Sequence, residues 1–319
     1  MEVPGEVGQQ LFRIGELLGT GATGAVYAGV GQQGAQVAVK FLHEHLTEDP
    51  TMVARFQREA KLAARIDSEF VAPVLASGRT RGLYWIAYKR LVGETLEARL
   101  HRERVLPSGA RCTIITQVLR GLAAAHAAGV VHRDVKPANV FLERLGSGER
   151  ACVLDFGVSK SRGGSSATSQ HPLTSDTETL GSVSYMAPEQ IGGSAHADTR
   201  ADVYAVGVVT FRAMAGRLPF AGSSRTVVLH AKLNTDPPTL AQVTGAVWPP
   251  RIEAFLARAL SRDLTGRYKS ADEARDAWEE AARDDLLPGH QDVGATAGET
   301  VGDDVTEVEP PPPDSRTNA

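Results

Sequence analysis

The chain has 319 residues, of which 42% are hydrophobic and 23% are charged, and its formal net charge is −4. This composition is ordinary for a soluble globular protein, and the length allows one large domain or two lobes with substantial cores. Two cysteines, Cys112 and Cys152, cannot form a disulfide framework, so a cytoplasmic location is expected. The start of the chain lacks the pattern of a secretory signal, and its longest apolar run, 203–211, is too short to span a bilayer.

Residues 12–91 predict a small β-rich lobe, because glycines alternate there with short β-branched runs. One helix interrupts it at 49–66, where apolar residues recur at spacings of three and four. After Thr95 the sequence reads as mostly helical, with a buried helix at 202–215. We therefore expect an α+β fold in which a small β-rich lobe precedes a larger helical one, and such junctions commonly form ligand clefts.

The negative charge is concentrated at the end of the chain. Residues 286–319 hold seven acidic residues and one basic residue, a charge of −6, which leaves about +2 on the remainder. Prolines, glycines and acids without periodic apolar residues predict that this segment is a disordered tail. A nearly neutral body lacks the clustered basic face typical of nucleic-acid binding, so no nucleic-acid partner is expected.

The stretch GTGATGAV carries Gly19, Gly21 and Gly24 in the spacing G-x-G-x-x-G. Glycines at this spacing let a backbone turn approach phosphate oxygens without interference from a Cβ atom. The spacing is weak by itself, and a simple turn is the alternative. A dinucleotide-binding turn would need a helix directly afterwards, whereas the following AVYAGV reads as a strand. A glycine-rich hairpin over a nucleotide fits better.

The stretch VAVK places Ala38 and Lys40 on one face of a strand, because side chains alternate along a strand. The small Ala38 would leave room for a flat base, and Lys40 would reach phosphates. A strand lysine is more often an exposed surface residue, so this interpretation needs an acidic partner. Glu59 is the candidate because it lies with the apolar stripe of the predicted helix, although an exposed charge is the alternative.

The stretch HRDVKPANVF concentrates polar groups in a predicted loop, since Pro137 disfavours helix at the residue before it. Asp134 can accept a proton from a hydroxyl, and Lys136 can neutralise a phosphoryl group in transfer. Asn139 offers an amide oxygen, and Asp155, at the end of the apolar strand predicted in VLDFG, offers a carboxylate; both are ligands that Mg²⁺ prefers. Each residue could be structural by itself, but together they predict phosphoryl transfer.

In the order of its motifs the chain resembles the eukaryotic-type (Hanks-type) serine/threonine protein kinases, in a bacterial style. The resemblance covers roughly 12–283 and rests on GTGATGAV, VAVK, HRDVKPAN, DFG, YMAPE, DVYAVG and GRY. Lysine two residues after the base is the serine/threonine pattern. The resemblance implies a bilobal kinase fold with an N-terminal extension (1–11), a kinase domain (12–285, divided after residue 91) and the tail.

The resemblance also implies roles for the residues that match. The three glycines would cover the ATP phosphates, and Lys40, paired with Glu59, would bind the α- and β-phosphates. Asp134 would be the catalytic base and Lys136 the γ-phosphate partner, while Asn139 and Asp155 would bind Mg²⁺, or alternatively Mn²⁺. The residues expected around the adenine and at the hinge are Leu18, Val26, Ala38, Tyr88, Lys89, Leu91 and Phe141.

Other matched positions are structural or depart from the family. Glu189 and Arg267 correspond to a buried ion pair, and Asp202 corresponds to the acid that steadies the catalytic loop. Ser182 stands where threonine is usual but keeps the hydroxyl. Lys89 stands where glutamate is frequent, and hinge contacts use backbone groups, so ATP binding is expected to survive.

Arg133 directly before the base is typical of kinases that are controlled by phosphorylation of the activation segment. The candidate phosphorylation sites are Thr174, Thr177 and Thr179, and a merely solvated loop is the alternative. Autophosphorylation between two self-associated copies would be one route.

In the tail, Thr300 and Thr306 each precede an acid by three residues and resemble the phosphothreonine ligands of forkhead-associated domains. An acidic solubilising linker is the favoured alternative. Two other functions are alternatives for the whole chain. A pseudokinase scaffold usually lacks the strand lysine, the base or the DFG aspartate, and a small-molecule kinase usually lacks the APE segment. Neither pattern fits this sequence, which leaves the protein substrate and the activating signal unnamed.

Overall fold

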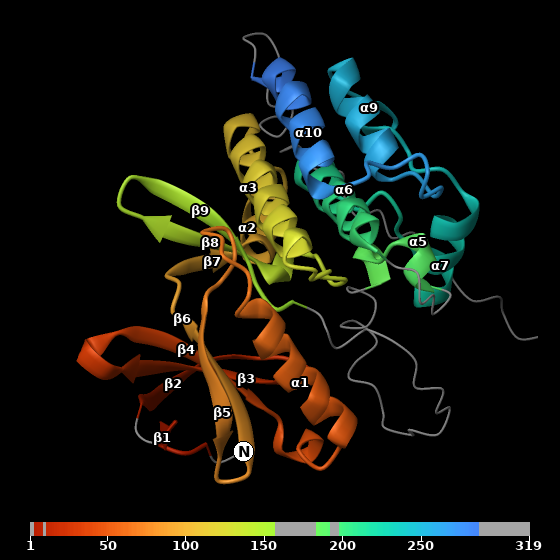
Figure 1. Cartoon of the computed structure of the whole chain (residues 1–319). Coiled ribbons are helices and arrows are strands. Elements are labelled where there is room, and N and C mark those ends of the chain that lie inside the picture. The colour runs from red at the N-terminus through yellow and green to blue at the C-terminus, as the bar shows by residue number, and fades with distance from the viewer. Residues whose placement is uncertain (1–2, 9–10, 157–182, 192–197, 287–319) are drawn as a thin grey trace, which may run out of the picture.

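The computed structural model describes residues 3–8, 11–156, 183–191 and 198–286, which form two lobes (Figure 1). The amino-terminal lobe is a six-stranded antiparallel sheet in the order β1-β2-β3-β4-β6-β5, with one helix, α1, packed against it. The elements are β1 (Glu6–Val7), β2 (Phe12–Thr20), β3 (Gly24–Gly31), β4 (Gln36–Leu42), α1 (Pro50–Ala63), β5 (Val74–Thr80) and β6 (Leu83–Lys89). The expected β-rich lobe with a single long helix is confirmed.

Strand β4 lies at the centre of this lobe and separates two small cores. Val39 and Phe41 pack into one core, whereas Leu42 packs with Phe56 of α1 in the other. Because side chains alternate along a strand, Lys40 lies on the same side as Leu42 and therefore under α1.

Helix α1 begins directly after its N-cap residue, Asp49. The Asp49 carboxylate accepts hydrogen bonds from the backbone N–H groups of Thr51 and Met52, at 2.8 and 3.4 Å, and Pro50 occupies the first turn. Such a cap contributes about 1 kcal/mol. The buried face that follows is Phe56, Glu59, Ala60 and Ala63. A carboxylate thus enters the lobe on an otherwise apolar face.

The carboxy-terminal lobe is helical and is built around α6, which is buried along almost its whole length. Its elements are α2 (Leu96–Glu103), α3 (Ser108–Ala127), α5 (Pro188–Ile191), α6 (Thr199–Ala215), α7 (Arg225–Asn234), α8 (Leu240–Thr244), α9 (Pro250–Ala259) and α10 (Ala271–Asp285). Gly216 ends α6 with a φ of 70°, a left-handed conformation that glycine adopts easily. No helix among the described residues has the length and apolarity to cross a membrane.

A second, three-stranded sheet lies between the lobes and departs from the mostly helical expectation after Thr95. It consists of β7 (Gly93–Thr95), β8 (Val140–Leu145) and β9 (Gly148–Val153), and β9 ends two residues before the expected limit at Asp155. These strands are too short to show a clear period in the sequence. The N–H of Val153 donates to the carbonyl oxygen of Phe70 at 2.8 Å, which ties this sheet to the amino-terminal lobe.

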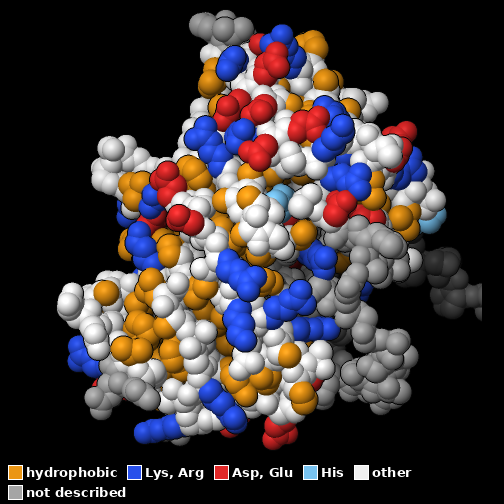
Figure 2. All heavy atoms as spheres, in the orientation of Figure 1, with side chains coloured by type: hydrophobic (Ala, Val, Ile, Leu, Met, Phe, Trp, Pro, Cys, Tyr) orange, Lys and Arg blue, Asp and Glu red, His pale blue; other side chains and the backbone are white. Residues whose placement is uncertain are grey.

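Charged side chains are distributed differently over the two lobes. On the face in Figure 2, acidic and basic side chains are interspersed over the helical lobe, whereas Lys and Arg side chains gather where α1 meets that lobe. Ion pairs of the helical lobe include Arg120–Glu279 and Arg258–Glu273. Exposed pairs of this kind contribute little to stability.

Candidate active site

A buried lysine joins three segments that are distant in the sequence. The Lys40 ammonium on β4 lies 2.9 Å from the Glu59 carboxylate on α1 and 2.9 Å from the Asp155 carboxylate. Burial disfavours the charge on this ammonium, but Asp155 and Glu59 outweigh burial and raise the pKa of Lys40 well above its ordinary value. The lysine is therefore a fixed positive charge, and the alternative of an exposed surface lysine is excluded.

Two polar residues of the predicted loop, Lys136 and Asn139, contact the third, Asp134. The Lys136 ammonium lies 3.0 Å from a carboxylate oxygen of Asp134, and the Asn139 amide N–H donates to the Asp134 carbonyl oxygen at 2.8 Å. Lys136 is extended, with φ −160° and ψ 162°, as expected for a residue before proline, and Pro137 starts a single 3₁₀ turn. The loop thus places the Asp134 carboxylate beside the Lys136 ammonium.

The Asp202 side chain, near the start of α6, anchors this loop through hydrogen bonds. Its fully buried carboxylate accepts hydrogen bonds from the backbone N–H of His132 at 2.8 Å and of Arg133 at 2.7 Å. Its other close contact is His126 Nε2 at 2.8 Å, on α3. Arg133 has a φ of 64°, an unusual conformation for a residue with a side chain, and these two hydrogen bonds stabilise it.

The residues expected to bind a divalent cation have the right donor atoms. Because the Asn139 amide nitrogen is committed to the Asp134 carbonyl oxygen, the amide oxygen is the atom that remains for a cation. One Asp155 oxygen contacts Lys40 and the side chain is 45% exposed, so the carboxylate is accessible. The N–H of Leu154 donates to the Asn139 carbonyl oxygen at 2.8 Å, which holds the two ligand segments side by side. Hard oxygen donors of this kind suit Mg²⁺.

The glycine-rich stretch forms the expected hairpin between β2 and β3, but its three glycines differ. A Cβ atom at Gly19 would meet nothing within 4 Å, and one at Gly21 would meet a backbone oxygen only at 4.0 Å, so both are open toward solvent. A Cβ atom at Gly24 would lie 2.0 Å from the carbonyl oxygen of Phe41. Gly24 is therefore required where β3 and β4 pair. The G-x-G-x-x-G spacing does not indicate this role.

The expected adenine and hinge residues lie on five strands, β2, β3, β4, β6 and β8, and in the linker after β6. Ala38 on β4 pairs in register with Tyr88 on β6, and Val26 on β3 pairs with Lys40. Lys89 ends β6, with its ammonium 3.3 Å from the Glu143 carboxylate. These residues are partly or fully exposed rather than core: Leu18, Val26, Ala38, Lys89, Leu91 and Phe141.

Two side chains near the site make contacts that the sequence did not predict. The Tyr88 hydroxyl donates to Glu59 at 3.4 Å, and burial, followed by the Glu59 charge, raises the pKa of this tyrosine well above its ordinary value. His43 contacts the carbonyl oxygen of Gly21 at 2.8 Å through Nε2. No residue spacing indicates either contact, because both partners are far away in the sequence.

The expected ion pair of the helical lobe is present. The guanidinium of Arg267, which is fully buried, donates to both oxygens of Glu189 at 2.7 and 2.8 Å. Directly after Glu189, the Gln190 amide accepts from the Ala187 N–H at 2.9 Å and donates to the Arg133 carbonyl oxygen at 3.1 Å. Gln190, which the sequence did not single out, therefore connects the APE segment to the catalytic loop.

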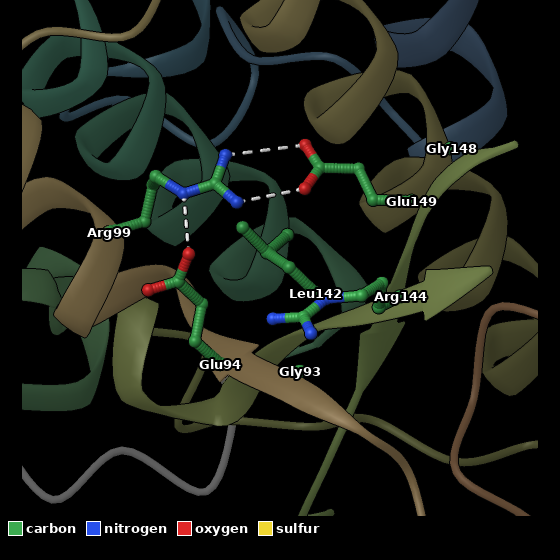
Figure 3. A pocket seen from close by; sticks show the side chains of 7 residues that line it. All are labelled: Gly93, Glu94, Arg99, Leu142, Arg144, Gly148 and Glu149. Carbon is green, nitrogen blue, oxygen red and sulfur yellow. Dashed lines mark hydrogen bonds and ion pairs between the residues drawn. The ribbon is translucent and has the colours of Figure 1, made fainter. Parts of the chain in front are cut away.

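A cavity of about 240 Å³ lies apart from these residues, between α2 and the sheet of β7, β8 and β9 (Figure 3). Arg99 donates to Glu149 on one side and to Glu94 on the other (Figure 3). Hydrogen bonds from Arg102 and Arg99 lower the pKa of Glu94 to about 2. Because Lys40, Asp134 and Asp155 do not line this cavity, it is not the candidate site. The candidate phosphorylation sites Thr174, Thr177 and Thr179, Ser182 and the tail threonines lie outside the described residues.

Comparison with known proteins points to one family. The sequence pattern described as "Protein kinase domain" matches residues 12–278. The serine/threonine-protein kinase Pkn1 of Myxococcus xanthus is 37% identical over 308 residues, which cover 96% of this chain and 42% of that protein. PknE of Mycobacterium tuberculosis, also named a serine/threonine-protein kinase, is 33% identical over 258 residues, which cover 81% and 44%. The chain thus spans less than half the length of these curated relatives.

A solved structure agrees with the sequence comparison. The kinase domain of PknI from Mycobacterium tuberculosis is 29% identical and superimposes with a TM-score of 0.67, covering 88% of this chain and 100% of that domain. The two lobes and the motif order therefore share one explanation: the chain belongs to the protein kinase family, among the bacterial Hanks-type serine/threonine kinases.

Proposed function

We propose that this chain transfers the γ-phosphoryl group of ATP to serine or threonine hydroxyls of proteins, in bacterial signalling, with Mg²⁺ as the preferred metal and Mn²⁺ as an alternative. The observation that carries the proposal is the 2.9 Å contact of Lys40 with both Glu59 and Asp155. The contact supports the proposal because the proposed nucleotide-binding lysine then lies next to the proposed metal-binding carboxylate. Protein kinases need both groups in position at the same time.

The proposed role of each residue follows from its charge. Lys40, held by Glu59, would bind the α- and β-phosphates, and the open positions at Gly19 and Gly21 would let the backbone approach phosphate oxygens. Asp134 would orient the acceptor hydroxyl and accept its proton, while Lys136, 3.0 Å away, would neutralise negative charge on the transferred group. Asn139 and Asp155 would hold the divalent cation, which supplies charge neutralisation at the phosphates when bound.

The direct test is transfer of label from [γ-³²P]ATP with Mg²⁺ to myelin basic protein and to the chain itself. We expect Asp134→Asn to lower transfer at least 100-fold, because the amide cannot accept the hydroxyl proton. Asp236→Asn is the matched control, since its exposed carboxylate pairs with Arg262 in the helical lobe, and it should retain full activity. A wild-type chain that binds ATP but labels neither protein would favour a scaffold.

The regulatory expectations are also proposals. We infer that Thr174, Thr177 or Thr179 is autophosphorylated between transiently associated copies, supported by Arg133 directly before Asp134. Mass mapping of the incubated protein should place phosphate on at least one of the three threonines. We take residues 12–285 as the catalytic unit. The tail 286–319 would then be dispensable for phosphoryl transfer. We also propose that Thr300 or Thr306, once phosphorylated, is a ligand of a forkhead-associated domain, because each precedes an acid by three residues.

A further inference from the structure

Lys232, on α7, is a fully buried lysine outside the catalytic cluster. Its ammonium donates to the carbonyl oxygen of Ser184 at 2.6 Å and to that of Met186 at 2.8 Å. It also lies 5.0 Å from the centre of the Tyr204 ring. Within the described part of the chain no carboxylate lies at ion-pair distance from this ammonium, so two backbone carbonyls and an aromatic ring hold the charge.

The electrostatic surroundings make this arrangement costly. The charge that acts on this ammonium is that of Arg267, which lies 4.9 Å from the centre of the same Tyr204 ring and is itself paired with Glu189. Burial, and then the Arg267 charge, lower the pKa of Lys232 to about 7. A methionine would fill a similar volume without burying a charge. The particular contribution of the lysine is therefore the pair of hydrogen bonds that it donates.

These hydrogen bonds fix a segment that adjoins the catalytic base. Ser184 and Met186 flank Tyr185, whose hydroxyl contacts the Arg212 guanidinium on α6. One residue further on, Ala187 is linked through Gln190 to the carbonyl oxygen of Arg133, the residue before Asp134. The segment 183–187 is thus held by the catalytic loop at one end and by Lys232 on α7 at its middle.

We propose that Lys232 is a positioning residue for the protein substrate: it fixes the backbone of 183–187 beside Asp134 and thereby the path of the acceptor polypeptide. A polypeptide that delivers its hydroxyl to Asp134 must run past the segment bound to the same loop. If this segment moves, the polypeptide loses its surface, whereas Lys40 and the glycine-rich hairpin, which would bind the ATP phosphates, lie in the other lobe. This inference rests on the proposed function.

The test compares Lys232→Met, which removes both hydrogen bonds, with Lys232→Gln, which keeps a donor without the charge. With myelin basic protein as acceptor, we expect Lys232→Met to raise the KM for the acceptor about tenfold and to leave the KM for ATP unchanged. Lys232→Gln should recover part of the loss. Lys269→Met, at an exposed lysine of the same lobe, should match the wild type.

Hydrogen exchange supplies a readout that does not depend on activity. Amides of 183–190 should exchange faster in Lys232→Met, while the core of α3 stays protected. An unchanged acceptor KM with a normally active wild type would overturn the inference alone. A proportional loss of ATP binding, acceptor binding and protection throughout the chain would also overturn it, because the lysine would then be merely structural. A wild type that labels nothing would refute the proposed function, and the substrate role would fall with it.

Discussion

Buried charged residues in this chain differ in how they are neutralised. Lys40 meets two carboxylates, and Asp202 meets two backbone N–H groups and a histidine. Lys232 meets carbonyl dipoles and a ring, with a second cation nearby. Carboxylates stabilise a buried ammonium more than dipoles do, so the two lysines have opposite pKa shifts.

The lowered pKa of Lys232 predicts a pH-dependent stability. Lysine titrates near 10.5 when unfolded and near 7 here, so between these values the unfolded chain binds more protons than the folded one. This group therefore makes the free energy of unfolding rise with pH across that window. Lys232→Met removes the contribution. In urea denaturation, the wild type should gain about 1–3 kcal/mol relative to Lys232→Met between pH 7 and pH 9.

Lys269→Met, at an exposed position, should show a pH profile parallel to the wild type. Parallel profiles for wild type and Lys232→Met would contradict the prediction, because they would mean that Lys232 keeps an ordinary pKa in the folded chain.

At the scale of elements, the β2–β3 hairpin combines positions that serve binding with one that serves pairing. A Cβ atom at Gly24 would lie 2.0 Å from the carbonyl oxygen of Phe41, and that backbone cannot retreat without separating β3 from β4. Lys40 lies on β4 next to this point, so strand separation would also displace it. The third glycine of the motif is needed for the sheet as much as for the ligand.

Gly24→Ala should therefore destabilise the chain by about 1–3 kcal/mol, the usual cost of an overpacked site. Gly21→Ala is the matched variant, since its nearest contact is 4.0 Å away, and it should change stability by less than about 0.5 kcal/mol. Thermal denaturation of the two variants checks both values. Equal melting temperatures for Gly24→Ala and the wild type would mean that the strands can separate at this point without cost.

At the scale of the whole molecule, the helical lobe is closed by its last helix. Arg111 on α3 and Asp285 at the end of α10 are both buried, with the guanidinium 2.6 Å from the carboxylate. Arg111 also donates to the carbonyl oxygen of Leu106 and lies 5.5 Å from the Trp248 ring. The family pattern ends at residue 278, whereas this contact ties the chain down through residue 285.

Asp285→Ala should cost about 3 kcal/mol, because it leaves a buried guanidinium without its carboxylate. The neighbouring Asp284→Ala is the control: that carboxylate lies 3.8 Å from Arg251, an exposed residue, and its removal should cost less than about 0.5 kcal/mol. Urea denaturation measures both. A similar loss in the two variants would show that α10 is anchored by its apolar face rather than by the ion pair.

The sequence by itself determined the family, the order of lobes and most chemistry-bearing residues. These features depend on local rules: Pro137 sets the conformation of Lys136, alternation sets the face of Lys40, and Asp49 sets the start of α1. Asp134 and Asn139 lie five residues apart, so one short loop brings them together.

Only the tertiary structure decided how distant segments meet. Lys40 contacts Asp155 across 115 positions, Asp202 binds the catalytic loop from α6, and Lys232 reaches the segment beside that loop. The pairing of β7, β8 and β9 into one sheet was likewise absent from the sequence patterns, which predicted only an apolar strand ending in Asp155. The sheet-pairing role of Gly24 was absent as well. Such contacts depend on how whole elements pack, and neither residue spacing nor local conformational preference encodes the partner of a buried polar group.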